Sequence, residues 1–389
     1  MKLPKIHKSI FIAISIISIG IALTTSSFTV KTLKYIQNIQ AQKQNLSTGL
    51  EVTKKELDTL KNQDQVKINQ SLQEQIKSIN KTYNDSISSF EKIIDLKTQK
   101  QDTSKLDLLY AQIVKYLSDK NYASGSAVLT DLNNQIQQTQ SKIAAANVPL
   151  SNPANNTPPD SGYSLQTVSA DGTNYNVAII AADLNSTKVI VDTASDSDCK
   201  DNCSVMPLAD YVSRNGAFAG INGSFFCPKE YPSCAGKTGS FDTLLMNKNK
   251  HYFNSDNNVY SSIPAAIFSS GSARFVGQSL EWGRDSGVDS VIANYPLLIS
   301  GGNINFTESP NEPKFGARGA RTFIANKGST VYIGVIYNAT MGESAKVLHA
   351  LGMGSAMNLD EGGSTALWSG GYKAGPGRNI PNAVLFVKR

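Results

Sequence analysis

Histidine is scarce in this sequence of 389 residues, which contains only three. Two of them, His251 and His349, lie beyond residue 162, and neither is near a serine elbow of the GxSxG type. A Ser-His-Asp hydrolase is therefore not expected. The sequence also lacks a P-loop and a dinucleotide-binding fingerprint, and no cofactor is predicted.

Arginine and glycine are nearly missing from the first 147 residues. All seven arginines lie beyond residue 213, and 26 of the 29 glycines lie beyond residue 147. The first part is instead rich in Gln, Asn, Lys, Ile and Leu. This change of composition indicates two parts of different kinds. They are joined by residues 148–162, VPLSNPANNTPPDSG, whose prolines favour a linker.

The net charge of +6 is unevenly distributed. Residues 1–30 carry +3, residues 31–147 carry 16 Lys against 12 acidic residues, and residues 148–389 carry 18 basic against 19 acidic residues. The part after the linker is therefore close to neutral, at −1. A nucleic-acid-binding protein needs a basic folded face, so no nucleic-acid partner is predicted.

Residues 1–30 combine a basic tip with an apolar stretch. Residues 9–30, SIFIAISIISIGIALTTSSFTV, are 22 residues without a charge, enough at ~1.5 Å per residue to span a bilayer core of ~30 Å. Three lysines precede the stretch, which predicts a cytoplasmic N-terminus and an extracytoplasmic remainder. Because the stretch is long for a signal peptide and its exit is a poor cleavage site, an uncleaved signal-anchor is favoured over a cleaved signal.

Residues 31–147 predict a helical stalk. Apolar side chains recur there at spacings of three and four, which is typical of an amphipathic helix. The most regular run is Leu72, Ile76, Ile79, Tyr83, Ile87, Phe90 and Ile94. Further apolar runs, with a break near residues 122–125, fit a helix that folds back as a hairpin. A parallel coiled coil fits as well, so a homo-oligomer formed through the stalk stays open. The predicted role is a spacer between the membrane and the next domain.

Four cysteines lie in one window of 36 residues: Cys199, Cys203, Cys227 and Cys234. In an exported chain such cysteines favour disulfides, and three pairings are open. Zinc is less favoured because there is no CxxC spacing and no histidine nearby. The acidic loop at residues 192–201 lacks the spacing of an EF-hand, so no metal site is predicted.

Residues 163–389 predict an α+β domain, strand-rich and with a mixed sheet. Short apolar runs alternate there with glycines. Helices are predicted over residues 207–215 and 343–351, and a hairpin around residues 326–328. The predicted strands are residues 175–182, 188–192, 217–222, 322–325, 331–337, 356–359 and 382–387.

Four short polar clusters stand where predicted strands end. They cover residues 222–226, 318–322, 358–365 and 375–382. Glycines beside a carboxylate allow backbone N–H groups to approach a ligand closely. Arginine is suited to bidentate contacts with phosphate or carboxylate. Taken together, the clusters predict a site for an anionic, hydroxyl-rich ligand.

The segments GINGSFF (220–226), ARTFIA (320–325), NLDEGGSTAL (358–367) and GRNIPNAVLFV (377–387) resemble the phosphodiester glycosidase family. This family includes the N-acetylglucosamine-1-phosphodiester α-N-acetylglucosaminidases. The resemblance covers roughly residues 164–389 and none of the stalk. One position departs from the family pattern, because Glu361 stands where the family usually has glycine.

The resemblance implies a hydrolase that cleaves sugar-1-phosphodiester linkages in surface glycans. Asp360 would act as the nucleophile or as the base for water, with Arg321 holding the phosphate and Glu361 as a second carboxylate. The implied substrate-binding residues are Asn222, Gly223, Phe225, Arg318, Gly362, Gly363, Ser364, Arg378 and Asn382. The alternative is a non-catalytic glycan-binding or adhesion module on a stalk, which the departure at Glu361 motivates.

Overall fold

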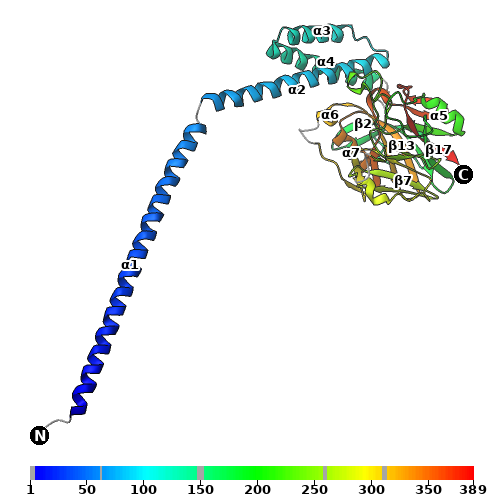
Figure 1. Cartoon of the computed structure of the whole chain (residues 1–389). Coiled ribbons are helices and arrows are strands. Elements are labelled where there is room, and N and C mark those ends of the chain that lie inside the picture. Colours follow the sequence, from blue (N-terminus) through cyan, green and yellow to red (C-terminus); the bar gives the residue numbers. More distant parts are fainter. Residues whose placement is uncertain (1–4, 62–63, 147–152, 257–260, 309–312) are drawn as a thin grey trace. The chain divides into compact units, whose positions relative to one another are not determined.

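The computed structural model describes all residues except 1–4, 62–63, 147–152, 257–260 and 309–312 (Figure 1). The chain divides into two compact units, residues 1–80 and residues 81–389. The first unit holds helix α1, Lys5–Lys61, and the start of helix α2, Asp64–Thr98. The second unit holds the end of α2 and everything that follows.

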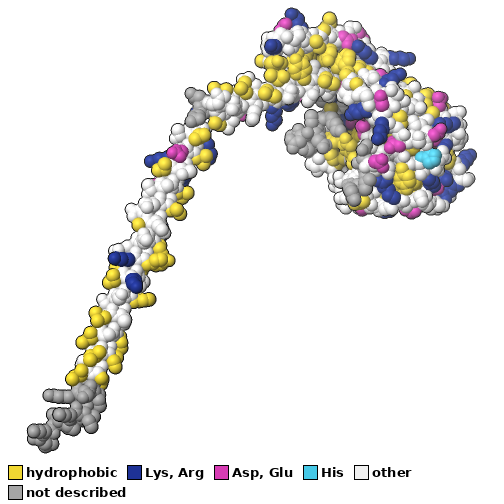
Figure 2. All heavy atoms as spheres, viewed as in Figure 1, with side chains coloured by type: hydrophobic (Ala, Val, Ile, Leu, Met, Phe, Trp, Pro, Cys, Tyr) yellow, Lys and Arg dark blue, Asp and Glu magenta, His cyan; other side chains and the backbone are white. Residues whose placement is uncertain are grey.

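Helix α1 contains the apolar stretch predicted from the sequence. It is long and apolar enough to cross a membrane, and none of its apolar window is buried inside the protein. Figure 2 shows hydrophobic side chains along the length of this helix. Such a segment at the N-terminus fits a membrane anchor or a signal sequence.

Three helical segments open the second unit. The end of α2 is followed by α3, Ser104–Ser118, and α4, Tyr122–Ala146. Leucine and isoleucine side chains from the three helices share a small core, and Phe90 of α2 stacks on Tyr110 of α3 with 4.7 Å between ring centroids. The helices therefore fold back on one another. The turn before α4 lies at Asp119–Asn121, slightly earlier than the break predicted at residues 122–125.

A seven-stranded sheet forms one part of the C-terminal domain, in the order β1-β2-β13-β12-β14-β10-β11. The middle strands β2, β12 and β13 contain continuous runs of buried residues, and β12 and β13 form the predicted hairpin with Gly328 at its tip. Their bounds are β1 Gly162–Ala170, β2 Thr173–Asp183, β10 Leu297–Ser300, β11 Asn303–Ile304, β12 Gly319–Lys327, β13 Thr330–Ala339 and β14 Ser355–Asn358.

Two five-stranded sheets complete the domain, with the orders β16-β15-β4-β17-β3 and β6-β5-β9-β7-β8. The first comprises β3 Thr187–Thr193, β4 Ala219–Asn222, β15 Leu367–Ser369, β16 Tyr372–Ala374 and β17 Asn382–Lys388. The second comprises β5 Leu245–Met246, β6 Tyr252–Phe253, β7 Ala265–Ser269, β8 Ser272–Val276 and β9 Ser290–Ala293. One large apolar core is shared by all three sheets, with Ile180, Ile221 and Phe268 as examples from each.

The predicted α+β, strand-rich class is confirmed. Pairing between the described strands is antiparallel in all three sheets, in place of the mixed sheet expected from the sequence. Some neighbouring strands, such as β1–β2 and β12–β13, follow one another in the chain and others do not. Antiparallel pairing needs no helical crossover. Figure 1 shows β2, β13 and β17 within one strand-rich body.

Two longer helices lie among the strands. Helix α5, Leu208–Asn215, follows Pro207, in agreement with the helix predicted over residues 207–215, and ends at Gly216 in the left-handed region. Helix α7, Met341–Ala350, begins two residues before the predicted start because Thr340 and Glu343 form a capping box. The short helical turns are α6 Pro313–Gly316, η1 Pro232–Cys234, η3 Ser279–Trp282 and η4 Gly362–Ser364.

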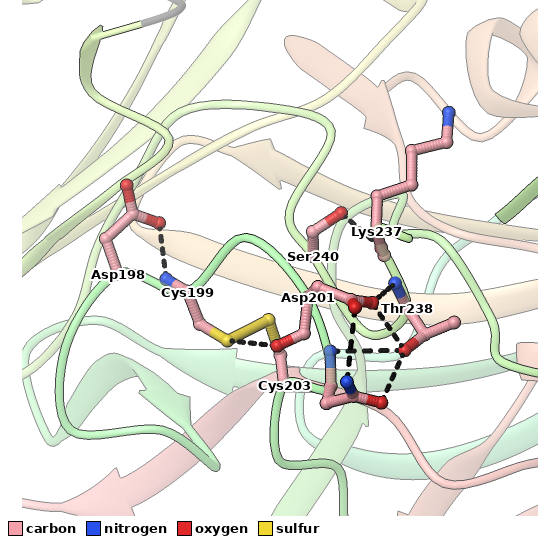
Figure 3. Close-up of a disulfide and its surroundings, with 8 residues drawn as sticks. Asp198, Cys199, Asp201, Cys203, Lys237, Thr238 and Ser240 are labelled. Carbon is pink, nitrogen blue, oxygen red and sulfur yellow. Dashed lines mark hydrogen bonds between the residues drawn. A yellow bond between two sulfur atoms is a disulfide. The ribbon is translucent and has the colours of Figure 1, made fainter. Parts of the chain in front are cut away.

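The cysteines form two short-range disulfides, Cys199–Cys203 and Cys227–Cys234. The prediction of disulfides is confirmed, and the pairing left open by the sequence is the local one. Figure 3 shows the first disulfide beside Asp201, whose carboxylate accepts hydrogen bonds from the Thr238 backbone N–H at 2.7 Å and hydroxyl at 2.9 Å. The second disulfide closes a loop of the domain that contains η1.

Candidate active site

The loop that follows β14 is attached to the end of β4 by three hydrogen bonds. The Asp360 backbone N–H donates to the Gly223 carbonyl at 2.8 Å. The Asn222 side chain donates to the Asp360 carbonyl at 2.6 Å and accepts from the Ala366 N–H at 3.0 Å. Two of the predicted clusters, from different sheets, therefore meet. Asn222 is fully buried and both polar atoms of its side chain are used, so it positions the Asp360 loop.

Asn382, at the start of β17, joins the same arrangement. Its side-chain oxygen accepts from the Ser224 N–H at 2.9 Å, and its carbonyl accepts from the Gly223 N–H at 3.1 Å. A Cβ atom on Gly223 would lie 1.7 Å from that side-chain oxygen. Only glycine fits at this position. Gly223 and Asn382, which the sequence predicted to bind substrate, thus lie beside Asp360 in contacts that support its loop.

The Asp360 carboxyl group is almost completely buried. The pKa of Asp360 is raised to about 8, chiefly by burial and also by the nearby carboxylates of Glu361 and Asp242. Hydrogen bonds from Ser364 and the Glu361 N–H partly offset this rise. Most of this group is therefore protonated at pH 7. A carboxyl group with a pKa near neutrality can exchange a proton with a reacting molecule.

Glu361 forms an ion pair with Arg321 of β12. Arg321 is buried, and its Nε donates to the Ala339 carbonyl at 3.1 Å, while Nη2 donates to the Ala317 carbonyl. The residue that departs from the family pattern is thus the carboxylate that neutralises Arg321. The second Glu361 oxygen, Oε2, is buried and makes no hydrogen bond within the described part of the chain.

Arg378 is the second buried arginine of the site. Its backbone N–H donates to the Gly363 carbonyl at 2.8 Å, and its guanidinium lies 4.7 Å from the centroid of the Tyr231 ring. Burial lowers the pKa of Arg378 to about 10, which leaves it charged at neutral pH. Nε and Nη1 are buried and have no hydrogen-bond partner among the described residues.

The double glycine Gly362–Gly363 lies against this guanidinium. Gly362 has a φ of +64°, which favours glycine, and a Cβ atom on Gly363 would lie 2.2 Å from Nη2 of Arg378. At this turn the backbone lies close to the Arg378 guanidinium, and the predicted approach of these glycines to a ligand stays a prediction. Ser364 is buried beside it and donates a hydrogen bond to Asp360.

Two residues of the site escaped prediction. The Tyr231 hydroxyl lies 2.8 Å from both carboxylate oxygens of Asp95, and Arg378 Nη2 forms an ion pair with Asp95. Tyr231 comes from the disulfide-closed loop, and burial raises its pKa, so it stays protonated. Asp95 belongs to α2, which the sequence indicated only as a stalk. No residue pattern connects it to Arg378, which is 283 positions away.

Phe225 and Arg318 contact residues outside the Asp360 loop. Phe225 is half-buried, receives its backbone support from Asn294 at 3.0 Å and packs edge-on against Tyr295. Arg318 donates to the Asn338 carbonyl at 2.7 Å and pairs with Glu343 in the first turn of α7. The structure thus places Arg318 at the start of a helix, where it also satisfies the capping glutamate.

The comparisons with known proteins agree with the resemblance. A family model described as phosphodiester glycosidase matches residues 215–387. No curated protein matches the chain. The matched residues 215–387 include Asn222, Arg321, Asp360 and Arg378. Of the candidate site, only Asp95 lies outside this range.

Several solved structures are similar to the chain. One is the zebrafish N-acetylglucosamine-1-phosphodiester alpha-N-acetylglucosaminidase catalytic domain auto-inhibited by pro-peptide, at 17% identity and a TM-score of 0.45, covering 60% of this chain and 85% of that one. A hypothetical protein from Synechocystis has 13% identity and a TM-score of 0.40, over 58% of this chain and 62% of that one. A putative exported protein from Burkholderia pseudomallei has 12% identity and a TM-score of 0.36, over 55% and 74%.

The matched region begins within α5 and ends in the last strand, so it contains the strands and loops that build the site. Within the C-terminal domain, residues 215–387 thus match the phosphodiester glycosidase family.

Proposed function

We propose that the protein hydrolyses sugar-1-phosphodiester linkages in surface glycans, of the kind named for the zebrafish relative. The observation that carries this proposal is a pair of buried groups on one loop system. Asp360 has a pKa of about 8, and Arg378 keeps two buried nitrogens without partners in the described residues. Asp360 can accept or donate a proton, and Arg378 can bind an oxyanion.

The proposed reaction breaks the bond between the sugar C1 and the phosphate oxygen. A water molecule attacks C1, its proton passes to ionised Asp360, and the electron pair of the broken bond leaves with the phosphate. A phosphate monoester is a stable anion, so the leaving group needs fixed positive charge more than a proton. Arg378 supplies that charge. A base is most effective when its pKa lies near the working pH, which suits Asp360.

The test replaces Asp360 with asparagine, which keeps the size of the side chain and removes its titration. Turnover of a nitrophenyl sugar phosphate should fall by at least a factor of ~100. Asp183→Asn is the matched control, because Asp183 is exposed at the end of β2 and should keep wild-type turnover. Wild-type turnover by Asp360→Asn would refute the role of Asp360 as the catalytic base. Reaction in oxygen-18 water should label the sugar, and label in the phosphate would refute cleavage at C1.

A second candidate function follows from the Glu361–Arg321 ion pair. If Glu361 removes the charge that the reaction needs, the domain binds sugar phosphates as a cell-surface adhesion module without hydrolysing them. Glu361→Gly restores the residue that the family pattern favours. Turnover in that variant together with binding but no turnover in the wild type would favour the adhesion module.

We further propose that the protein is a single-pass membrane protein with an extracytoplasmic C-terminal domain. Three observations support this topology: the apolar stretch in α1, the lysines that precede it and the two disulfides. Positive residues favour the cytoplasmic side, and disulfides persist outside the cytoplasm.

The stalk supports a homo-oligomer. After the apolar stretch, α1 carries side chains at alternating spacings of three and four, the a and d positions of a heptad repeat. These are Ile36, Ile39, Lys43, Leu46, Leu50, Thr53, Leu57 and Leu60. The six apolar members are exposed. Glu56 and Lys61 fall at g and e positions, where they can pair between two parallel helices. Two copies anchored in one membrane would present these faces in parallel.

A further inference from the structure

The last turns of α2 contact the loop closed by the Cys227–Cys234 disulfide. Glu91 and Asp95 are four residues apart and therefore lie on one face of the helix. Glu91 accepts hydrogen bonds from the backbone N–H and the hydroxyl of Ser233. Asp95 reaches the Tyr231 hydroxyl and Arg378. Two carboxylates of one helix face thus engage the candidate active site and its rim.

The Asp95 carboxylate lies against the double glycine. The position of a Cβ atom on Gly362 is 3.1 Å from its Oδ2, and that on Gly363 is 2.7 Å from its Oδ1. Any side chain at residue 363 would therefore overlap both the carboxylate and the guanidinium. The Gly362–Gly363 turn and Arg378 could bind an anionic ligand. In this structure they contact the Asp95 carboxylate instead.

Arg378 has more donors than Asp95 uses. Its Nη2 contacts the carboxylate, whereas Nε and Nη1 are buried without a partner among the described residues. A guanidinium offers five N–H donors in a planar fork. A tetrahedral oxyanion has more oxygens than a carboxylate and can accept from a larger part of that fork. The subsite is thus better matched to a phosphate group than to its present occupant.

We propose that Arg378, Tyr231 and the Gly362–Gly363 turn form an oxyanion subsite, and that Asp95 is its resident intramolecular ligand. An anionic ligand of the phosphate class has to displace Asp95, and with it the end of α2, to enter the subsite. The identity of that ligand as the substrate's phosphodiester rests on the proposed function. The competition between Asp95 and an anionic ligand does not depend on the proposed function, because it follows from the contacts of Asp95.

A tethered competitor lowers the apparent affinity of the site. When the competent state is only a small fraction of the population, the measured dissociation constant rises by the inverse of that fraction. Because the carboxylate is part of the same chain, its effective concentration at the site is on the order of millimolar or higher. Removing its charge should therefore tighten the binding of free phosphate by roughly ten- to a hundredfold.

The experiment titrates the full-length protein in detergent micelles with inorganic phosphate, followed by calorimetry. Asp95→Asn keeps the shape of the side chain and removes its charge. Asp85→Asn is the matched control, because Asp85 lies on the same helix, is half-exposed and pairs with Lys81 rather than with the domain. We expect tighter phosphate binding in Asp95→Asn, wild-type binding in Asp85→Asn, and loss of the gain when Arg378→Lys is added. Equal phosphate affinity in Asp95→Asn and the wild type would overturn the proposal.

Turnover separates this proposal from the proposed function. If both are correct, Asp95→Asn also increases kcat/KM for a nitrophenyl sugar phosphate. If phosphate binding tightens and no variant turns over substrate, the subsite and its competitor stand while the hydrolase assignment fails.

A second measurement uses the wild-type protein and so does not depend on the folding of a variant. Saturating phosphate should raise amide hydrogen exchange in residues 91–98, because the end of α2 leaves its contacts. Exchange in residues 106–117 of α3 is the internal reference. Unchanged exchange at residues 91–98 with phosphate bound at Arg378 would also overturn the proposal.

Discussion

Asp360 shows how one buried side chain sets a dependence on pH. Its pKa is about 8 in the folded protein, against about 3.8 for the unperturbed group. The folded state therefore holds one more proton than the unfolded state between these values. The free energy of unfolding falls as pH rises through this window, because the folded state binds a proton that the unfolded state has already released. The fall is complete above pH 8.

Asp360→Asn should remove this dependence. The wild-type free energy of unfolding should fall by about 1.4 kcal/mol per pH unit between pH 5 and 7.5 relative to the variant. Urea unfolding of the full chain in detergent, followed by the fluorescence of its two tryptophans, measures the difference. Both tryptophans, Trp282 and Trp368, lie in the C-terminal domain. Parallel stability curves for the two proteins would contradict a raised pKa.

Glu361 offers a second test at the scale of a residue. Its ion pair neutralises Arg321, so Glu361→Gly should leave that guanidinium available to an anionic substrate. We expect KM for a nitrophenyl sugar phosphate to fall several-fold, with a smaller change in kcat. Glu230→Gln is the control, because Glu230 is an exposed acid of the disulfide-closed loop. An unchanged KM in Glu361→Gly would show that the pair does not limit binding.

The sequence predicted only part of the site at this scale. Asp360, the double glycine and Arg378 stood in motifs, and the structure brings them together. Arg318 stood in a motif too, yet it pairs with a helix start. Asp95 and Tyr231 could not be predicted, since one lies within an ordinary amphipathic helix and the other in a loop without a pattern. Their contact exists only after the chain has folded.

Several of the long strands followed their sequence signals. Strands β2, β13 and β17 have buried apolar runs, and their predicted positions agree with the structure. Strand β1, which is nine residues long, was not predicted. The four- and five-residue strands β7, β8, β9 and β10 and the shorter strands β5, β6, β11, β15 and β16 were not predicted either. A strand of two residues has no measurable period, and its pairing depends on neighbours that lie far away in the sequence.

Helix α7 depends on its capping box. Thr340 accepts a hydrogen bond from the Glu343 N–H at 3.2 Å, and Glu343 accepts from the Thr340 N–H at 2.8 Å. Thr340→Ala should lower the free energy of unfolding by about 1 kcal/mol. Urea unfolding measures this loss, and KM should stay unchanged because the box is not part of the site. A loss of activity without a loss of stability would contradict this separation.

The heptad positions of α1 predict a change of oligomeric state. Leu50→Asp places a charge at an a position and should convert a dimer to a monomer, because the charge would be buried between two helices. Light scattering of the full chain in detergent measures the mass. Thr48→Asp, at the outward f position, is the matched control. A wild-type mass equal to that of Leu50→Asp would contradict a coiled coil through this face.

At the scale of the whole molecule, the proposed topology makes a prediction about access. Protease added to intact cells should remove the C-terminal domain while the N-terminal tip stays protected. A tag placed at each end and detected by immunoblot distinguishes the two sides. Protection of the C-terminal tag in intact cells, with loss after permeabilisation, would contradict an extracytoplasmic domain.

The disulfide-closed loop has a consequence for timing. Nucleotide sugars, which are made in the cytoplasm, also have a phosphate oxygen on C1 of the sugar, as one end of a diphosphate. Tyr231 lies in the ring closed by Cys227 and Cys234. Disulfides form in oxidising compartments, so in the proposed topology this ring closes after the chain has left the cytoplasm. If the proposed function is correct, a complete site arises only on the far side of the membrane. The protein would then not hydrolyse the nucleotide sugars of the cytoplasm, because its site is completed only after export.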